Sequence, residues 1–347
     1  MRVLFDAYWW NEGPPSNQAV QRELIRAWVE RFPHDEAILA IPGGAATSAP
    51  VPQSAKVLRT RLSPHGVSAA SWLPVLARKQ RADLMITHNF TPVAGRAAVF
   101  VHDVLFQTDP DWFSRAERTY LAPIPALARR AEVVFTSSRS EADRIRTRNP
   151  GIQRVVPVGL HVKSALLGAR PKRPTLPDLD GFVLSVGRLN VRKNLRTALS
   201  AAVASGVLTA RRPMLVVGAP DGPSEEFDAP VRAASARGEI LFLGALTDDE
   251  VAWLYRNADC FLFLSRAEGF GLPPLEAATF GCPVVVSDIP VMREVCADGA
   301  AFVPPDDVTA AAAAIRAALS RGRREPVLPD ADPWLAIVER MRAALVS

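Results

Sequence analysis

Cysteine is scarce in this chain, which has three among its 347 residues. The three are Cys260, Cys282 and Cys296, an odd number without the Cys-x-x-Cys spacing of a zinc or redox site. We therefore expect neither a disulfide framework nor a zinc site, and we interpret these thiols as small core residues.

Long apolar runs are also missing. The first ten residues, MRVLFDAYWW, are apolar over too few positions for a signal peptide, and Asp6 interrupts them. No later segment reaches the roughly 20 apolar residues that a membrane-spanning helix needs. These absences predict a cytoplasmic protein.

Two further absences argue against whole classes of ligand. The strand expected over 214–218 ends in Gly-Ala-Pro and lacks the Gly-x-Gly-x-x-Gly pattern, which gives NAD binding little support. No nucleic-acid-binding motif or interleaved aromatic series accompanies the arginines of the chain. We therefore expect no nucleic-acid partner.

Positive charge is unevenly distributed. Residues 1–163 hold 21 Lys and Arg against 14 Asp and Glu, whereas the rest of the chain holds 20 against 22. The clustered arginines are Arg129, Arg130, Arg139, Arg144, Arg146 and Arg148. They leave two interpretations open, a basic face toward anionic lipid or an acidic acceptor, and a solvated helix surface.

The remaining composition is that of a globular protein, because nearly half of the residues are apolar. Short buried strands alternate with helical segments along the chain, which predicts α/β domains with parallel sheets. The length is sufficient for two domains. We place the first domain at 1–163, a proline-rich linker at 164–181 and the second domain at 182–330.

One stretch combines several features of a ligand site. Residues 265–277 read SRAEGFGLPPLEA and follow a short apolar block at 260–264, which suits a strand buried on both faces. Gly269 and Gly271 let the backbone turn sharply and approach a ligand. The helix that we expect to begin at Leu275 turns its free N–H groups toward that loop, where they favour a phosphate.

Two carboxylates flank this loop. Glu268 lies on the loop and Glu276 in the first turn of the expected helix, so both can point into one crevice at the carboxyl end of the strand. That is where open α/β sheets bind ligands. The alternative is a simple tight turn, with Glu276 serving only as a favourable charge near the helix dipole.

A second polar segment follows the strand expected over 182–186. Residues 187–194 read GRLNVRKN and precede a helix that begins near Leu195. Arg188 and Lys193 stand five positions apart just before this helix, where two bases can neutralise a diphosphate without a metal. A surface charge pair is the alternative interpretation.

Two polar groups in the first half could also carry chemistry. His102 and Asp103 follow directly on a strand, at the edge of the sheet where ligands bind, and a core histidine hydrogen-bonded to Asp103 is the alternative interpretation. Asp109, Pro110 and Asp111 have the Asp-x-Asp spacing of a metal–diphosphate site. Because Pro110 stiffens the pair and a helical sequence follows, we interpret Asp111 as a helix cap.

The stretch from Glu268 to Glu276, with Gly-Phe-Gly-Leu-Pro in the interval, resembles the EX7E motif of the retaining glycosyltransferases of family four, which have the GT-B fold. The His-Asp pair, the 187–194 segment and residues 287–295 are similar to further motifs of this family. The resemblance covers nearly the whole chain and is strongest over 182–306. It implies two Rossmann-like, doubly wound parallel-sheet domains that face each other across a cleft, with residues 331–347 forming a helix that crosses back to the first domain.

The resemblance also implies a role for each site residue. Arg188 and Lys193 would hold the donor pyrophosphate, while Glu268 would hydrogen-bond the donor sugar and Glu276 the nucleotide ribose. His102 would contact the donor sugar or shape the reacting centre. The donor site would be completed by Gly269, Phe270, Gly271 and Leu272.

The chain departs from the family in the loop after the first strand. The family commonly has a Gly-Gly pair there, whereas residues 9–18 read WWNEGPPSNQ and contain only Gly13. Ser16 and Asn17 complete this expected loop between acceptor and donor. The departure leaves the acceptor geometry open.

The resulting expectation is a retaining, mannosyltransferase-like hexosyltransferase of polysaccharide or glycoconjugate synthesis. It would move a sugar from a nucleoside-diphosphate sugar to a glycan, lipid-linked or small-molecule acceptor, with no metal and no other cofactor. It would work in the cytoplasm, or at the inner face of the membrane if the basic first domain contacts lipid. A sugar-nucleotide epimerase of similar fold and a non-catalytic sugar-nucleotide-binding protein stay open as alternatives.

Overall fold

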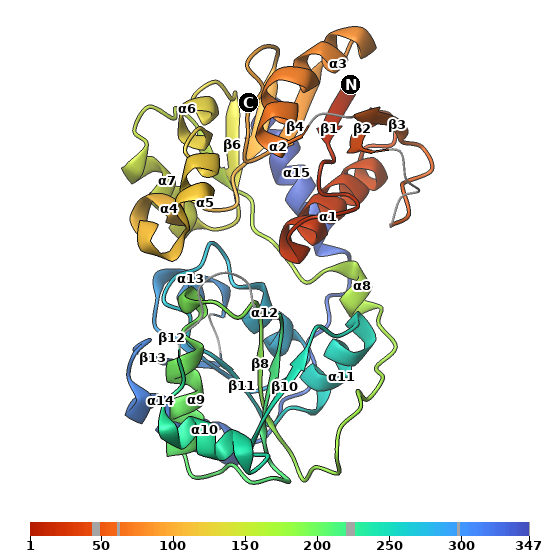
Figure 1. Cartoon of the computed structure of the whole chain (residues 1–347). Helices are drawn as coiled ribbons and strands as arrows, with labels where there is room; N and C mark the ends of the chain where they lie inside the picture. The colour runs from red at the N-terminus through yellow and green to blue at the C-terminus, as the bar shows by residue number, and fades with distance from the viewer. Residues whose placement is uncertain (44–48, 61–62, 220–225, 297–298, 347) are drawn as a thin grey trace. The chain divides into compact units, whose positions relative to one another are not determined.

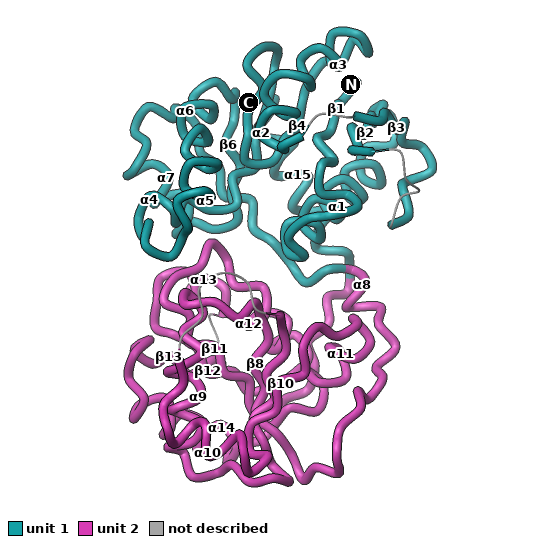
Figure 2. Tube along the Cα trace, in the orientation of Figure 1, with its two compact units in different colours: residues 1–163, 331–347 teal, residues 164–330 magenta. Residues whose placement is uncertain are grey.

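The chain folds as two compact units, each built on its own sheet (Figure 1). A computed structural model describes residues 1–43, 49–60, 63–219, 226–296 and 299–346. Unit 1 joins residues 1–163 to residues 331–347, and unit 2 contains residues 164–330 (Figure 2).

Unit 1 is organised around seven parallel strands in the order β3-β2-β1-β4-β5-β6-β7. The strands are β1 (Arg2–Asp6), β2 (Glu36–Pro42), β3 (Lys56–Thr60), β4 (Leu84–His88), β5 (Ala97–Phe100), β6 (Val133–Thr136) and β7 (Val155–Pro157). The strand order reverses between β1 and β4. In an open α/β sheet, ligands bind at such a switch point, outside the carboxyl ends of the strands.

The helices of unit 1 include a segment from the far end of the chain. They are α1 (Pro15–Arg31), α2 (His65–Val67), the π-helix η1 (Ser68–Trp72), α3 (Leu73–Gln80), α4 (Leu105–Thr108), the 3₁₀ helix η2 (Pro110–Trp112), α5 (Arg115–Leu121), α6 (Ile124–Ala128), α7 (Arg139–Arg148) and α15 (Pro333–Val346). Helix α15 packs against α1. The indole Nε1 of Trp334 donates to the carbonyl of Val162 at 3.0 Å, which fixes the start of α15 to the end of the first segment.

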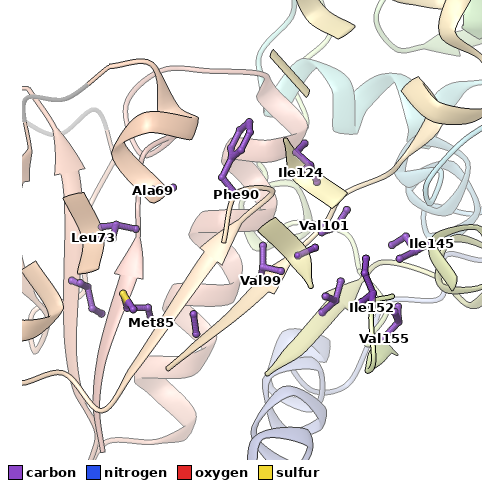
Figure 3. Packing of buried hydrophobic residues seen from close by; sticks show 14 of the residues in the cluster. Ala69, Leu73, Met85, Phe90, Val99, Val101, Ile124, Ile145, Ile152 and Val155 are labelled. Carbon is purple, nitrogen blue, oxygen red and sulfur yellow. The ribbon is translucent and has the colours of Figure 1, made fainter. Parts of the chain in front are cut away.

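The central strands β4, β5 and β6 are buried throughout and mostly apolar, as expected where helices cover both faces of a parallel sheet. Figure 3 shows part of this core, in which Met85 of β4 and Val99 of β5 lie in one cluster with Leu73 and Phe90. Such burial stabilises the unit by about 25 cal/mol for each Å² of apolar surface removed from water.

Unit 2 repeats the plan with six parallel strands in the order β10-β9-β8-β11-β12-β13. The strands are β8 (Val183–Val186), β9 (Met214–Val217), β10 (Ile240–Gly244), β11 (Cys260–Phe263), β12 (Val284–Ser287) and β13 (Ala300–Val303). The order reverses between β8 and β11. The loops after these two central strands therefore share the switch point of unit 2.

The helices of unit 2 are α8 (Ser164–Leu167), the 3₁₀ helix η3 (Val191–Lys193), α9 (Leu195–Ala204), α10 (Ala229–Ala236), α11 (Asp248–Asn257), α12 (Leu272–Thr279), α13 (Pro290–Val295) and α14 (Val308–Arg321). A reciprocal capping box of Thr247 and Glu250 starts α11, as the T-x-x-E pattern predicts. Within the described ranges, none of the helices combines the length and apolar character that a bilayer crossing requires.

Two helix starts differ from the sequence interpretation. Asp111 does not cap the helix after it, because it lies inside η2, and Ser114 caps α5 through a capping box with Glu117. Helix α12 begins at Leu272 and not at Leu275, so that both prolines lie in its first turn. Proline is tolerated there because its missing N–H has no partner within the helix anyway.

Candidate active site

Two glycine-containing loops meet at the carboxyl edge of the unit 2 sheet. Gly187 follows β8 and Gly218 follows β9, with positive φ angles of 154° and 143°. A Cβ on Gly218 would lie 1.9 Å from the carbonyl oxygen of Gly187. No larger residue fits this approach, which brings the 187–194 segment against the end of the neighbouring strand.

A small hollow, partly open to solvent, lies at this edge. Its lining includes Gly187, Arg188, Leu189, Lys193, Val217 and Phe263. The residues come from the ends of β8, β9 and β11, and thus from the switch point of the sheet. The structure therefore places the two predicted bases, Arg188 and Lys193, in one concave site.

Lys193 and Glu268 form a direct ion pair beside this hollow. The Nζ of Lys193 lies 2.6 Å from Oε1 of Glu268, and Nη1 of Arg192 lies 3.0 Å from Oε2. Glu268 is only 6% exposed. The carboxylate is thus held between two cations, and Arg192 is a site residue that the sequence interpretation missed.

The spacing of the basic residues in the sequence does not identify Arg192 as a partner of Glu268, and the reason is physical. The sequence segment contains Arg188, Arg192 and Lys193, and spacing alone does not say which bases turn toward Glu268. The 3₁₀ turn of η3 decides it, because it brings the consecutive residues Arg192 and Lys193 to the two oxygens of one carboxylate.

Burial and charge compete in setting the protonation of this cluster. Burial alone would raise the pKa of Glu268, but the positive charges of Lys193 and Arg192 outweigh it and lower the pKa to about 2. Burial lowers the pKa of Lys193 to about 8; the charge of Arg192 acts in the same direction, and that of Glu268 opposes it. At neutral pH the pair is therefore ionised.

The backbone around Lys193 is held by two asparagines. The side chain of Asn190 accepts from the Lys193 N–H at 3.3 Å. Asn194 has a left-handed conformation with φ 53°, and its buried amide donates to the carbonyl of Pro305 at 2.8 Å. Lys193 also lies over the ring of Phe263, with Nζ 4.7 Å from the centroid. These contacts restrict where the ammonium group can lie.

The loop after β11 leads into α12 through Gly271, whose φ is 101°. This left-handed conformation favours glycine, and a Cβ at this position would also displace the end of the Met292 side chain, whose Cε would lie 2.3 Å away. Gly269 is buried, Phe270 is half-buried, and Leu272 is the first residue of α12. The N-terminal amides of α12 follow directly, and such amides favour anions.

Glu276 has a partner of its own. The carboxylate of Glu276, in the second turn of α12, accepts from the phenol of Tyr255 at 2.8 Å. Tyr255 lies on α11 and is fully buried. Glu268 and Glu276 thus have different partners: cations hold the first, and a buried phenol holds the second.

In unit 1, His102 lies just after β5 and contacts a second histidine. Its Nε2 lies 3.2 Å from Nδ1 of His88 at the end of β4. Burial and the charge of His65 lower the pKa of His102 to about 3. Burial, His102 and His65 also lower the pKa of His88 well below its usual range. Both rings are therefore neutral at neutral pH, and one donates to the other.

An Asp–His pair lies at the same edge of the unit 1 sheet. Oδ2 of Asp6, the last residue of β1, lies 2.6 Å from Nε2 of His65, and both residues are buried. The ring of Tyr8 stacks on His65 at 4.5 Å between centroids, and that of Trp9 lies 4.7 Å away. The sequence interpretation missed His65, because no motif connects it to Asp6.

The predicted loop of Gly13, Ser16 and Asn17 needs a correction. Gly13 does lie in a loop, with φ 135° and Trp9 packed against the position a Cβ would take. Ser16 and Asn17, however, belong to the first turn of α1, which begins at Pro15. The fixed φ of Pro15 suits the first helical position, so the helix begins inside the stretch 9–18 that was expected to be loop.

Metal ligands do not gather in the described part of the chain. No group of three or more His, Cys, Asp or Glu side chains there is arranged to hold an ion. Whether the protein works without a metal stays a prediction.

The two parallel sheets, each with a switch point, and the basic hollow of unit 2 define a GT-B protein of two Rossmann-like units. Residues 170–327, somewhat less than half of the chain, match the family model "Glycosyl transferases group 1". This match bears out the predicted resemblance to group 1 glycosyltransferases, and the solved structures described below bear out the predicted GT-B fold. Membership of family four in particular stays a prediction.

Curated relatives are bacterial sugar transferases. The O-antigen chain mannosyltransferase B of Escherichia coli is 30% identical over 230 residues, 63% of this chain and 60% of that protein. The O-antigen chain mannosyltransferase RfbU of Salmonella typhimurium is 27% identical over 224 residues, 64% of this chain and 60% of that protein. The matched segment thus spans about 60% of the length of each relative.

Solved structures share the fold at low identity. Sucrose-phosphate synthase from Thermosynechococcus elongatus matches with a TM-score of 0.70 and 17% identity, covering 100% of this chain and 94% of that one. WaaG, a glycosyltransferase involved in lipopolysaccharide biosynthesis, matches with a TM-score of 0.63 and 16% identity, covering 99% and 95%.

Proposed function

We propose that this protein transfers a hexosyl group from a nucleoside-diphosphate sugar to an acceptor hydroxyl, with retention of configuration and without a metal. The observation that carries the proposal is the cluster of Lys193, Arg192 and Glu268 beside the hollow that Arg188 lines. Cations next to a carboxylate suit a substrate that has a diphosphate and a hydroxyl-rich ring. The mannosyltransferase relatives support the same substrate class.

The reaction breaks the bond between the anomeric carbon and the diphosphate oxygen. Negative charge grows on that oxygen, and Arg188 and Lys193 stabilise it together with the N-terminal amides of α12. Positive charge grows on the sugar ring, where Glu268 accepts hydrogen bonds from ring hydroxyls and stabilises oxocarbenium character. Glu276 accepts from the nucleotide ribose.

The acceptor oxygen forms its bond to the anomeric carbon on the face that the diphosphate leaves. The proton of the acceptor hydroxyl passes to the departing phosphate oxygen, so that no separate base is required. Arg192 has a supporting part, because its contact with Glu268 keeps the carboxylate ionised beside Lys193.

The pairing of Lys193 with Glu268 has a consequence for donor binding. A diphosphate must compete with Glu268 for the ammonium group, while the donor sugar supplies hydroxyls to the carboxylate in exchange. A nucleoside diphosphate without a sugar provides only the first half of this exchange. The proposed function therefore predicts that the intact sugar nucleotide binds more tightly than the nucleoside diphosphate.

The test is incubation with labelled nucleoside-diphosphate hexoses, GDP-mannose first, with and without glycan and lipid-linked acceptors. Label that moves to an acceptor supports the proposal. Conversion of the donor sugar without acceptor would identify an epimerase. Tight donor binding with neither reaction would identify a binding protein, the alternative that the single Gly13 in the first loop favours.

The proposal also includes a contact between exposed arginines of unit 1 and the membrane surface. Arg129 and Arg130 are exposed at the end of α6, and Nη2 of Arg130 donates to the carbonyl of the exposed Val93 at 2.6 Å. Arg144 and Arg146 pair with acidic side chains within α7 and contribute less. We assign Arg129 and Arg130 to the contact with anionic lipid at the inner face of the membrane.

Sedimentation with vesicles of phosphatidylglycerol and phosphatidylcholine tests the lipid contact. The protein should bind the anionic vesicles in low salt, and the double variant Arg129→Ala, Arg130→Ala should bind much less. If the double variant binds the anionic vesicles as well as the wild type does, Arg129 and Arg130 do not form the lipid contact.

A further inference from the structure

Tyr255 is the largest fully buried side chain that the structure describes in unit 2, and the proposed reaction gives it no part. It lies on α11, and its phenol donates to Oε2 of Glu276 on α12 at 2.8 Å. A phenol–carboxylate hydrogen bond is stronger than a neutral one because the acceptor is charged. The contact thus connects an interior residue to a carboxylate of the site.

The ring of Tyr255 is fixed by its neighbours. Phe280, which follows α12, stacks on it with centroids 6.0 Å apart and an interplanar angle of 7°. Phe261 of β11 lies 5.7 Å away at 59°. The position of the phenol oxygen is therefore set by the packing of the core and not by the ligand.

A glutamate carboxylate rotates easily, because its terminal torsion has broad minima. The contact with Tyr255 occupies Oε2 and restricts this rotation, which leaves Oε1 in a defined orientation. A fixed acceptor recognises a pair of adjacent hydroxyls better than a mobile one, since less entropy is lost on binding.

We propose that Tyr255 is a positioning residue that orients the carboxylate of Glu276 to accept hydrogen bonds from the ribose hydroxyls of a nucleoside diphosphate. This inference rests on the proposed function, because it takes Glu276 as the ribose ligand. Tyr255 acts only through Glu276 and contributes to the affinity for ribonucleotides over nucleotides that lack these hydroxyls.

A structural role alone would have different consequences. Loss of a buried hydrogen bond lowers the stability of unit 2 and leaves the relative affinities for two nucleotides unchanged. The ratio of affinities for a ribonucleoside diphosphate and its 2′,3′-dideoxy analogue therefore separates the two roles. Both ligands have the same base and diphosphate, so every other contact cancels.

The experiment uses the full chain and isothermal titration calorimetry. Uridine, guanosine, adenosine and cytidine diphosphates are screened on the wild type, and the one that binds is compared with its dideoxy analogue. We expect a ratio on the order of tenfold or more in the wild type and below about threefold in Tyr255→Phe. The affinity for the dideoxy analogue should change little.

Thr279→Val is the matched control. The hydroxyl of Thr279 donates to the carbonyl of Leu275 on the same helix at 2.8 Å, and its removal costs α12 a hydrogen bond without touching Glu276. This variant should keep the wild-type ratio. A lowered ratio in the control would mean that any loosening of α12 has the effect, and would overturn the specific role of Tyr255.

Two further variants approach the contact from the other partner. Glu276→Asp keeps the charge but withdraws the carboxylate from both Tyr255 and the ribose, so a lowered ratio in this variant confirms the ribose contact of Glu276, and an unchanged ratio overturns the inference. In a Glu276→Ala background, adding Tyr255→Phe should leave ribonucleotide affinity unchanged, because Tyr255 has no other route to the ligand.

The outcomes separate the two levels of the proposal. A wild-type ratio that persists in Tyr255→Phe overturns the positioning role and leaves the proposed function intact. Failure of every nucleoside diphosphate, and of the corresponding sugar nucleotides, to bind the wild type overturns the proposed function and this inference with it.

Discussion

The ammonium group of Lys193 lies 2.6 Å from the carboxylate of Glu268, although the two residues are 75 positions apart in the sequence. The family resemblance implies separate roles for them, with Lys193 binding the donor pyrophosphate and Glu268 the donor sugar. Their ion pair makes them one electrostatic unit, in which each sets the protonation of the other. Removal of Glu268 therefore takes the carboxylate away from a buried ammonium group, whereas removal of Lys193 leaves Glu268 with Arg192.

Lys193→Ala should reduce turnover by something like 10²-fold or more, because a charge placed at the leaving diphosphate is lost. Steady-state kinetics with saturating sugar nucleotide measures this. Arg196→Ala is the control, since Arg196 is an exposed base on α9 that pairs with Asp228 at 2.7 Å. Full activity in the Lys193 variant would contradict its place in the site.

Nucleoside-diphosphate binding should weaken in alkali. Lys193, whose pKa burial lowers to about 8, is protonated below that pH and loses its charge as the pH rises through it. The affinity should fall by on the order of tenfold between pH 7 and pH 9, as titration calorimetry would show. In Lys193→Ala the affinity should be low at pH 7 and nearly flat over the range. A flat wild-type profile would contradict the assignment.

Gly218→Ala should destabilise unit 2 strongly. The new Cβ would lie 1.9 Å from the carbonyl oxygen of Gly187, and the positive φ adds backbone strain, for a total of roughly 2–4 kcal/mol. Gly206→Ala is matched to it, because Gly206 has φ 70° but open space around the Cβ position, so about 1 kcal/mol is expected. Equal urea midpoints for the two variants would show that the close approach does not matter.

Ser114→Ala should destabilise unit 1 by about 1 kcal/mol, because it removes the hydroxyl that accepts from the Glu117 N–H and caps α5. Asp111→Ala should stay within about 0.5 kcal/mol, since Asp111 is exposed and caps nothing. Thermal unfolding of the two variants measures the difference. A larger loss of stability in Asp111→Ala than in Ser114→Ala would indicate that Asp111 is the helix cap.

The sequence was most informative where one local rule governs both the residues and their conformation. The buried strands, the capping box at Thr247 and the preference for glycine at position 271 follow from apolar patterning and backbone sterics within a few residues. Helices α1 and α12 begin earlier than the sequence pattern predicts, at Pro15 and Leu272. A proline is typical of a helix boundary, yet the first turn of a helix accepts it.

The sequence by itself determined the α/β class of both units, the family motif around Glu268, and the positions of Arg188, Lys193 and Glu276 at the ends of strands and the starts of helices. Only the tertiary structure decided that Arg192 shares Glu268 with Lys193, that Tyr255 holds Glu276, and that His65 meets Asp6. The reason is physical. These contacts join side chains from elements far apart in the sequence, and their geometry depends on how strands and helices pack, which no local pattern encodes.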